Sequence, residues 1–289
     1  MAAESTIYAS QLRLELCLRN RAYCKALSHV ESYGSMPVIV YEPSPDGSRH
    51  GNFSDRAYDA IRSRPEWFRR FAKVHAQAKR ALPKSQRGWR ELDSSMSSDA
   101  LLMNVFCYPG VCDDARVADM LGVEKGLIPE FGFRAKVPLA SGGVDRTEVD
   151  MRLGNLLVES KLTELDFQSK SAEVVEAYRD FEEVFDHRQL PHTDDVYASY
   201  QLIRNVLAAH ALECSFCVLH DGRRPDLREA WFAVMSAVKS GDLRRRCKVL
   251  TWEELSAALP SDLRAFLDVK YGITPPGVIP SAVPGWPLD

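Results

Sequence analysis

Two carboxylates and a lysine near the middle of the chain have the types and the spacing for metal-dependent chemistry. Residues 148–161 have the form of two short strands joined by a tight turn at Gly154 and Asn155. In that register Asp150 faces Glu159, with Cβ atoms roughly 5 Å apart. Like charges at this distance repel each other. Either the surface tolerates this strain, or a cation lies between the two carboxylates, and hard oxygen ligands suit Mg²⁺ or Mn²⁺.

The same hairpin has an apolar face and a charged face, because neighbouring side chains of a strand point to opposite sides. The apolar face holds Val149, Met151, Leu153, Leu156, Val158, Ser160 and Leu162, and the charged face holds Glu148, Asp150, Arg152, Leu157, Glu159 and Lys161. Lys161 thus lies beside the carboxylates, where it could hold a water or a phosphate oxygen. The alternative is a solvated hairpin with a cross-strand Glu148–Lys161 ion pair. Glu148 is otherwise a candidate ligand of a second metal ion.

The elements on either side of the hairpin indicate a mixed arrangement of strands and helices. The pattern predicts strands over residues 131–139, 215–220 and 247–251, and helices over residues 97–107, 172–185, 193–211 and 225–240. The last of these helices has a proline near its first position. The end of the chain is rich in proline and is expected to be an extended tail.

Asp150, followed on the next strand by Glu159-Ser-Lys161, resembles the Asp…Glu-x-Lys signature of the PD-(D/E)XK nuclease superfamily. The chain also resembles an uncharacterised bacterial family of restriction endonuclease-like proteins. The segments that carry this likeness are residues 51–55, 90–104, 159–164 and 200–205. The residue before the aspartate is often proline in the superfamily and is Val149 here.

This resemblance implies an α/β, restriction-endonuclease-like fold with an α-β-β-β-α-β core, in which helices flank a mixed sheet. Residues 96–272 would form that core. Residues 1–95 would be an N-terminal helical region packed on it, and residues 273–289 the proline-rich tail.

The resemblance also assigns roles to the hairpin residues. Asp150 and Glu159 would ligate Mg²⁺ or Mn²⁺, with the Ser160 carbonyl as a further ligand. Lys161 would orient the attacking water or stabilise the charge of the transition state. Gln201, on the helix after the hairpin, would help to hold the water.

Three further residues are weaker candidates under the same resemblance. Arg204 would hold a phosphate from the helix of Gln201, although a polar helix face is an equally good interpretation. Glu91 would be an additional acidic ligand, where capping of a helix is the commoner role. Glu164 follows the hairpin closely and is either part of the site or a carboxylate at the strand edge.

Composition narrows the class of protein. Hydrophobic residues make up 45% of the chain and charged residues 27%, which excludes a mainly disordered protein. No apolar run approaches the length of a membrane span, and the first residues lack the pattern of a secretory signal. We therefore expect a cytoplasmic protein without a membrane partner. The 7 cysteines are irregularly spaced, which argues against a disulfide framework.

Charge distribution favours a nucleic-acid partner. The net charge is −3, yet residues 51–90 hold 11 lysines and arginines against 3 acids, with aromatic residues between them. Such a segment suits phosphate contacts and base stacking, although a solvated helix is an equally good interpretation. Together with the hairpin, the resemblance implies a metal-dependent nuclease that hydrolyses phosphodiester bonds. The resemblance alone favours DNA over RNA, and a homodimer is one candidate assembly. The alternative is a catalytically inactive nuclease-like fold that serves as a nucleic-acid- or protein-binding module.

Overall fold

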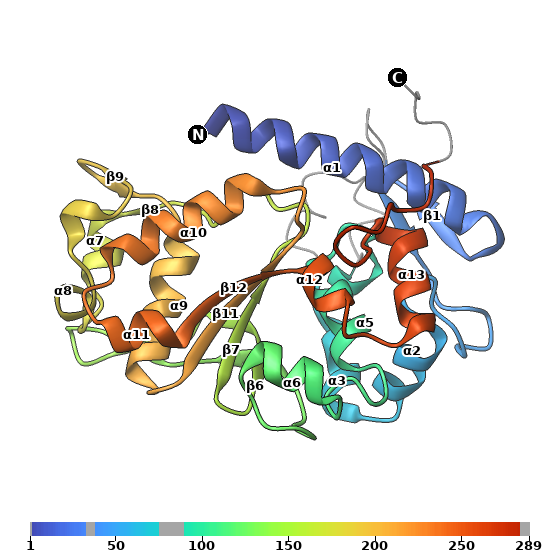
Figure 1. Cartoon of the computed structure of the whole chain (residues 1–289), viewed down its shortest axis with the longest axis horizontal. Coiled ribbons are helices and arrows are strands. Elements are labelled where there is room, and N and C mark those ends of the chain that lie inside the picture. Colours follow the sequence, from blue (N-terminus) through green and yellow to red (C-terminus); the bar gives the residue numbers. More distant parts are fainter. Residues whose placement is uncertain (1, 33–37, 75–89, 284–289) are drawn as a thin grey trace. The chain divides into compact units, whose positions relative to one another are not determined.

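The computed structural model describes residues 2–32, 38–74 and 90–283 (Figure 1). Contacts divide the chain into two compact units. The sheet unit comprises Met1–Ala9 and Ile128–Thr251, and the helical unit comprises Ser10–Leu127 and Trp252–Asp289. Residues 96–127 and 252–272, which were predicted to share one core with the hairpin, lie in the helical unit in this division.

A five-stranded mixed sheet, in the order β12-β11-β7-β6-β3, forms the centre of the sheet unit. The strands are β3 (Glu130–Arg134), β6 (Glu148–Leu153), β7 (Leu156–Ser160), β11 (Ser215–His220) and β12 (Cys247–Thr251). β3, β6 and β7 pair antiparallel, whereas β7, β11 and β12 pair parallel. β7 is therefore the strand at which the sheet changes from antiparallel to parallel pairing, and all five of its residues are buried.

Parallel neighbours need crossover connections, and helices supply them. α9 (Tyr200–Ala211) connects β7 to β11, while α10 (Pro225–Ala237) and α11 (Gly241–Arg246) connect β11 to β12. Figure 1 shows these three helices beside the sheet. The prediction of an α/β fold with a mixed sheet and flanking helices is confirmed.

Both the first turn of α9 and its apolar face are held in place. Its first residues are held by the preceding loop, since the backbone N–H groups of Tyr200 and Gln201 donate to the carbonyls of Gln168 and Phe167 at 2.9 and 3.0 Å. Its apolar side chains share one core cluster with Leu157 of β7. The helix therefore covers the face of β7 that carries Leu157.

Two predicted helices of the sheet unit were wrong in extent. Residues 172–185 form two short helices, α7 (Ala172–Glu176) and α8 (Phe181–Val184), because the chain between them turns so that Tyr178 can form a bridge with Leu139. The helix predicted from residue 193 begins only at Tyr200. The residues before it form β9 (His192–Thr193) and β10 (Val196–Tyr197), which pair with each other and, through β10, with β8 (Lys170–Ser171).

Shorter elements complete the sheet unit. β4 (Val137–Pro138) and β5 (Val144–Asp145) form a small hairpin, and η5 (His187–Gln189) is a single 3-10 turn. The strands predicted at residues 215–220 and 247–251 are confirmed, and the helix predicted over 225–240 is present as α10 but ends at Ala237. α11 was not anticipated; its first turn is capped by Ser240, whose hydroxyl accepts the backbone N–H of Leu243.

The helical unit is built mainly from helices around a two-stranded sheet. Its elements are most of α1 (Ala2–Tyr23), η1 (Cys24–Ala26), β1 (His29–Glu31), β2 (Ile39–Tyr41), α2 (Asp55–Arg62), α3 (Pro65–Phe68), η2 (Arg69–Ala72), η4 (Glu91–Asp93), α5 (Ser98–Phe106), α6 (Ala115–Leu121), α12 (Trp252–Ser256) and α13 (Ser261–Tyr271). The helix predicted at 97–107 is thus confirmed as α5. Among the described residues, no helix is long and apolar enough to cross a membrane.

One lysine of this unit is fully buried. The Nζ atom of Lys270 on α13 donates to Oδ1 of Asn20 at 2.7 Å and lies 3.9 Å from the centre of the Tyr41 ring. Tyr41 also donates its hydroxyl proton to the same oxygen of Asn20 at 2.8 Å. Burial lowers the pKa of Lys270 well below its usual value.

Candidate functional site

The hairpin of β6 and β7 has the register that its turn residues predict. The paired positions run from Leu153–Leu156 to Met151–Val158. Beyond the last of these pairs, Oδ2 of Asp150 accepts the backbone N–H of Ser160 at 2.7 Å. The carboxylate of Asp150 is thus tied to the strand that carries Glu159.

The charged face of β7 is buried instead of solvated. Only 1% of Glu159 and 4% of Lys161 is exposed, and the Lys161 Nζ atom donates to Glu159 Oε1 at 2.7 Å. The carboxylate of Glu148 lies 3.6 Å from the guanidinium of Arg134 on β3. The solvated-hairpin interpretation therefore does not hold for β7, whereas Glu148, Asp150 and Arg152 on the same face of β6 are half-buried.

Several negative charges act on the ammonium of Lys161. Burial by itself would lower the pKa of this group, but the carboxylates of Glu159, Glu164 and Asp150 outweigh that effect. The pKa of Lys161 is consequently raised above its usual 10.5, and the ammonium stays protonated at neutral pH. Three of the predicted acidic residues thus act together on one cation.

α9 contributes two buried side chains to this cluster. Asn205 is fully buried, and its Nδ2 atom donates to Glu159 Oε2 at 2.8 Å. Arg204 is 3% exposed and donates to Oδ1 of Asn205 through Nε at 3.1 Å and Nη2 at 2.9 Å. Sequence reasoning proposed Arg204 but missed Asn205. The available signal was spacing, since Asn205 lies one helical turn after Gln201 and hence on the same face of α9.

Gln201, the other predicted residue of α9, has an incomplete set of hydrogen bonds. Its Oε1 atom is buried and has no hydrogen-bond partner among the described residues. An unsatisfied buried oxygen is costly, and such atoms often mark a place where water or a ligand binds. Phe167, whose carbonyl accepts the backbone N–H of Gln201, also contacts Lys161. The Nζ atom of Lys161 lies 5.5 Å from the centre of the Phe167 ring. The role predicted for Gln201 stays a prediction.

The loop after β7 is held rigidly. The backbone N–H of Leu162 donates to Oε2 of Glu164 at 2.7 Å. Arg224, which is fully buried, donates to the carbonyls of Glu164 and Leu165 at 2.7 and 2.9 Å and pairs with Asp226 at 2.7 Å. These contacts hold Glu164 in the position where its carboxylate helps to raise the pKa of Lys161.

Other sequence-based expectations fall in the helical unit. Glu91 lies in η4, half-buried, and its role as a ligand stays a prediction. In the basic segment, Arg70 and Lys73 both bind the buried Asp99, at 2.7 and 3.0 Å. The segment's Lys79, Arg80, Lys84 and Arg87 lie outside the described residues. Some of the segment's charge is therefore used within the fold.

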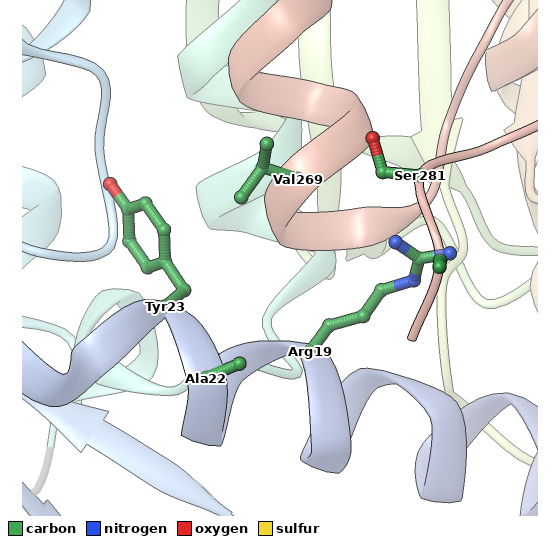
Figure 2. Close-up of a pocket in the computed structure, with 6 residues that line it drawn as sticks. Arg19, Ala22, Tyr23, Val269 and Ser281 are labelled. Carbon is green, nitrogen blue, oxygen red and sulfur yellow. The ribbon is translucent and has the colours of Figure 1, made fainter. Parts of the chain in front are cut away.

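The helical unit also contains a small pocket, drawn in Figure 2. It has a volume of about 160 Å³ and is lined by Arg19, Ala22, Tyr23, Val269, Ser281 and Ala282. The guanidinium of Arg19 at its wall is bound by Glu15 at 2.8 Å and by the Asp268 carbonyl at 3.2 Å. None of the residues predicted from the sequence lines this pocket.

The sheet unit has a second cluster of potential metal ligands. Atoms of Asp180, Glu183 and His210 lie within 4.8 Å of one another. The carboxylate of Asp180 is already bound on both oxygens by Arg179, at 2.7 and 2.9 Å. All 7 cysteines of the chain are free, in agreement with the expectation from their spacing.

Comparison with protein families identifies the group to which the sequence is related. The model of the REase-ARP family, described as Restriction Endonuclease associating with ARP, matches residues 18–272. The chain belongs to the REase-ARP family. The matched range includes the whole β6–β7 hairpin and α9, and membership of REase-ARP indicates a nuclease-like function. Comparisons with curated proteins and with solved structures each gave no match.

Proposed function

We propose that this chain is a metal-dependent nuclease that hydrolyses phosphodiester bonds in DNA. The observation that carries the proposal is the buried Glu159–Lys161 pair, with Asp150 tied beside it, in a chain of a restriction endonuclease family. Buried charges are costly, and strongly perturbed ionisable groups are concentrated at functional sites. We further propose that the sheet unit has the restriction-endonuclease-like core. Its order of three antiparallel strands, a helix and a parallel strand supports this view.

The donor set near Asp150 suits Mg²⁺ or Mn²⁺. It would consist of the carboxylates of Asp150 and Glu159 and the carbonyl of Ser160, all hard oxygen ligands. Each of the two carboxylates is already oriented by a hydrogen bond, from the Ser160 backbone N–H and from Asn205. When bound, the ion would polarise the phosphate and lower the pKa of a bound water.

The remaining chemistry is done by side chains of the protein. The protonated ammonium of Lys161 donates a hydrogen bond to a phosphate oxygen and stabilises the charge that grows there in the transition state. The Oε1 atom of Gln201 accepts a hydrogen bond from the attacking water and thereby orients it. The burial of the cluster strengthens these interactions, because little water screens them.

Plasmid cleavage tests this proposal directly. Purified protein is incubated with supercoiled plasmid or linear single-stranded DNA and either Mg²⁺ or Mn²⁺, beside the variants D150N, E159Q and K161M. These substitutions keep the shape of each buried side chain. We expect metal-dependent cleavage that falls at least about 100-fold in each variant. The control E176Q, in which the altered carboxylate accepts the Tyr197 hydroxyl at 2.9 Å, should cleave like wild type.

Three other outcomes would have different meanings. Undiminished cleavage by D150N and E159Q would refute the site. Mn²⁺ binding without cleavage would indicate a missing substrate or partner, such as the ARP in the description of the family. A folded protein that neither cleaves nor binds Mn²⁺ would favour the alternative of a nuclease-like binding module.

A further inference from the structure

A continuous chain of hydrogen bonds runs from α9 to the centre of the candidate site. Arg204 donates to Oδ1 of Asn205, Nδ2 of Asn205 donates to Oε2 of Glu159, and Nζ of Lys161 donates to Oε1 of the same carboxylate. The donor–acceptor distances lie between 2.7 and 3.1 Å. All four side chains are at least nine-tenths buried. The contacts are therefore shielded from water.

The chemistry of its two neighbours determines the orientation of the Asn205 amide. A guanidinium only donates hydrogen bonds, and an ionised carboxylate only accepts them. The amide oxygen of Asn205 must therefore face Arg204, and its nitrogen must face Glu159. Rotation of the amide by 180° would bring two oxygens together at Glu159 and two donors together at Arg204. Arg204 thus selects the one orientation in which Asn205 can hold Glu159.

The two contacts on Glu159 fix its carboxylate in turn. One donor binds each oxygen, Lys161 on Oε1 and Asn205 on Oε2, so the plane of the carboxylate cannot rotate without losing a bond. Each oxygen keeps a second lone-pair direction. Those directions are the ones that a metal ion would use.

We propose that Arg204 and Asn205 are positioning residues, which act through Glu159 and do not touch the substrate. This inference rests on the proposed metal-dependent function and adds to it two residues that set the geometry of a ligand. It also replaces the phosphate-binding role expected of Arg204 from the sequence. The Nε and Nη2 atoms of that guanidinium are used by Asn205 and by the Glu148 carbonyl, the latter at 3.0 Å, and only 3% of the residue is exposed.

Two measurements on the whole 289-residue chain test the inference. The first is the dissociation constant for Mn²⁺, followed by the electron paramagnetic resonance signal of free Mn²⁺. We expect N205L and R204M to weaken Mn²⁺ binding about 10-fold or more, and R204K to retain most of the affinity because lysine can still donate to Oδ1 of Asn205. The control R246M removes an arginine that donates to the carbonyls of Ala209 and Cys214 at the other end of α9, and it should bind Mn²⁺ like wild type.

The second measurement needs no metal. The unfolding equilibrium constants of N205L, E159Q and the double variant are compared in urea with EDTA present. If Asn205 acts on Glu159, the fold-change of the unfolding constant in the double variant should differ about 10-fold from the product of the two single-variant fold-changes. A difference of about 10-fold is the size expected for a hydrogen bond to a charged group, about 1.5 kcal/mol. Because R204M leaves Asn205 in place, its Mn²⁺ affinity also remains informative if N205L fails to fold.

The outcomes separate this inference from the function on which it rests. Wild-type protein that binds Mn²⁺, with N205L and R204M unchanged from it, would overturn the positioning role and leave the nuclease proposal intact. Independent effects of N205L and E159Q on unfolding would also overturn that role. Wild-type protein that binds no Mn²⁺ would overturn the proposed function, and with it the positioning of a metal ligand, even where the coupling between Asn205 and Glu159 is found.

Discussion

Replacing either member of the Glu159–Lys161 pair should destabilise the fold, and replacing both should cost less than the sum. E159Q leaves the Lys161 ammonium buried without the oxygen charge 2.7 Å away, and K161M leaves the Glu159 carboxylate with its Asn205 contact. Removing one partner of a buried ion pair typically costs about 3–5 kcal/mol. We therefore expect each single variant to lose about 3 kcal/mol of unfolding free energy.

Repulsion between carboxylates works in the opposite direction and has to be weighed. With an effective dielectric constant of about 20, charges 2.7 Å apart attract by about 6 kcal/mol. Two like charges at the Cβ separation of a cross-strand pair, roughly 5 Å, repel by about 3 kcal/mol on the same scale. The attraction of Glu159 to Lys161 thus exceeds its repulsion from Asp150, and E159Q should destabilise the protein.

Urea unfolding at pH 7 with EDTA, followed by circular dichroism, measures these quantities. The coupling energy from E159Q, K161M and the double variant should be about 2 kcal/mol or more. The pair Arg179–Asp180 has the same 2.7 Å separation, but 59% of the Arg179 side chain is exposed, so the matched cycle of R179M and D180N should give a much smaller coupling. A more stable E159Q, or additive effects of E159Q and K161M, would show that the electrostatic reasoning is wrong.

Three further predictions concern other parts of the chain. K270M should stabilise the protein by about 1–2 kcal/mol at pH 7, because it removes a buried amine and leaves Asn20 bound to the Tyr41 hydroxyl. Since burial lowers the pKa of Lys270, the unfolded chain takes up a proton that the folded chain lacks, and wild-type stability should rise with pH from that lowered pKa up to about 10.5. The urea midpoints of wild type and K270M at pH 7 and pH 9.5 test both points. A midpoint that rises with pH as much in K270M as in wild type would contradict the role given to Lys270. G272A should cost more than about 1 kcal/mol, because Gly272 has a φ of +67° and a Cβ there would lie 2.7 Å from the Arg19 guanidinium carbon. G277A is its control in the same urea assay, with a φ of +81° and no atom within 4 Å of its Cβ, and equal losses would mean that the contact with Arg19 is harmless. Burial raises the pKa of the Cys217 thiol to about 12. Iodoacetamide at pH 8 should therefore modify Cys217 only after unfolding, which peptide mass spectrometry can measure. Rapid labelling of Cys217 in the native protein would disprove this prediction.

Local sequence signals predicted the hairpin because everything that sets its register is local. Gly154 and Asn155 define the turn, and the side chains alternate on either side of it. The same pattern could not tell which face of the hairpin is covered. The burial of Glu159 and Lys161 depends on α9, which comes much later in the sequence.

Elements that depend on distant partners were harder to predict. The start of α9 was placed too early because Val196 pairs with Ser171 and with Thr193. The spacing of apolar residues within a short window does not show that such pairing occurs. Asn205 was missed for a related reason. An asparagine in an apolar helix has many possible roles, and its contact with Glu159 is visible only once the helix has a position on the sheet.

The hydrogen bond between Glu159 and Asn205 joins residues 46 positions apart. A ligand that requires both residues can bind the folded chain but not the unfolded one, so it must raise the temperature at which the protein melts. At a ligand concentration 100 times its dissociation constant, this stabilisation amounts to about 2.7 kcal/mol. Melting curves with a panel of metal ions and oligonucleotides can therefore identify what the site binds before any cleavable substrate is known.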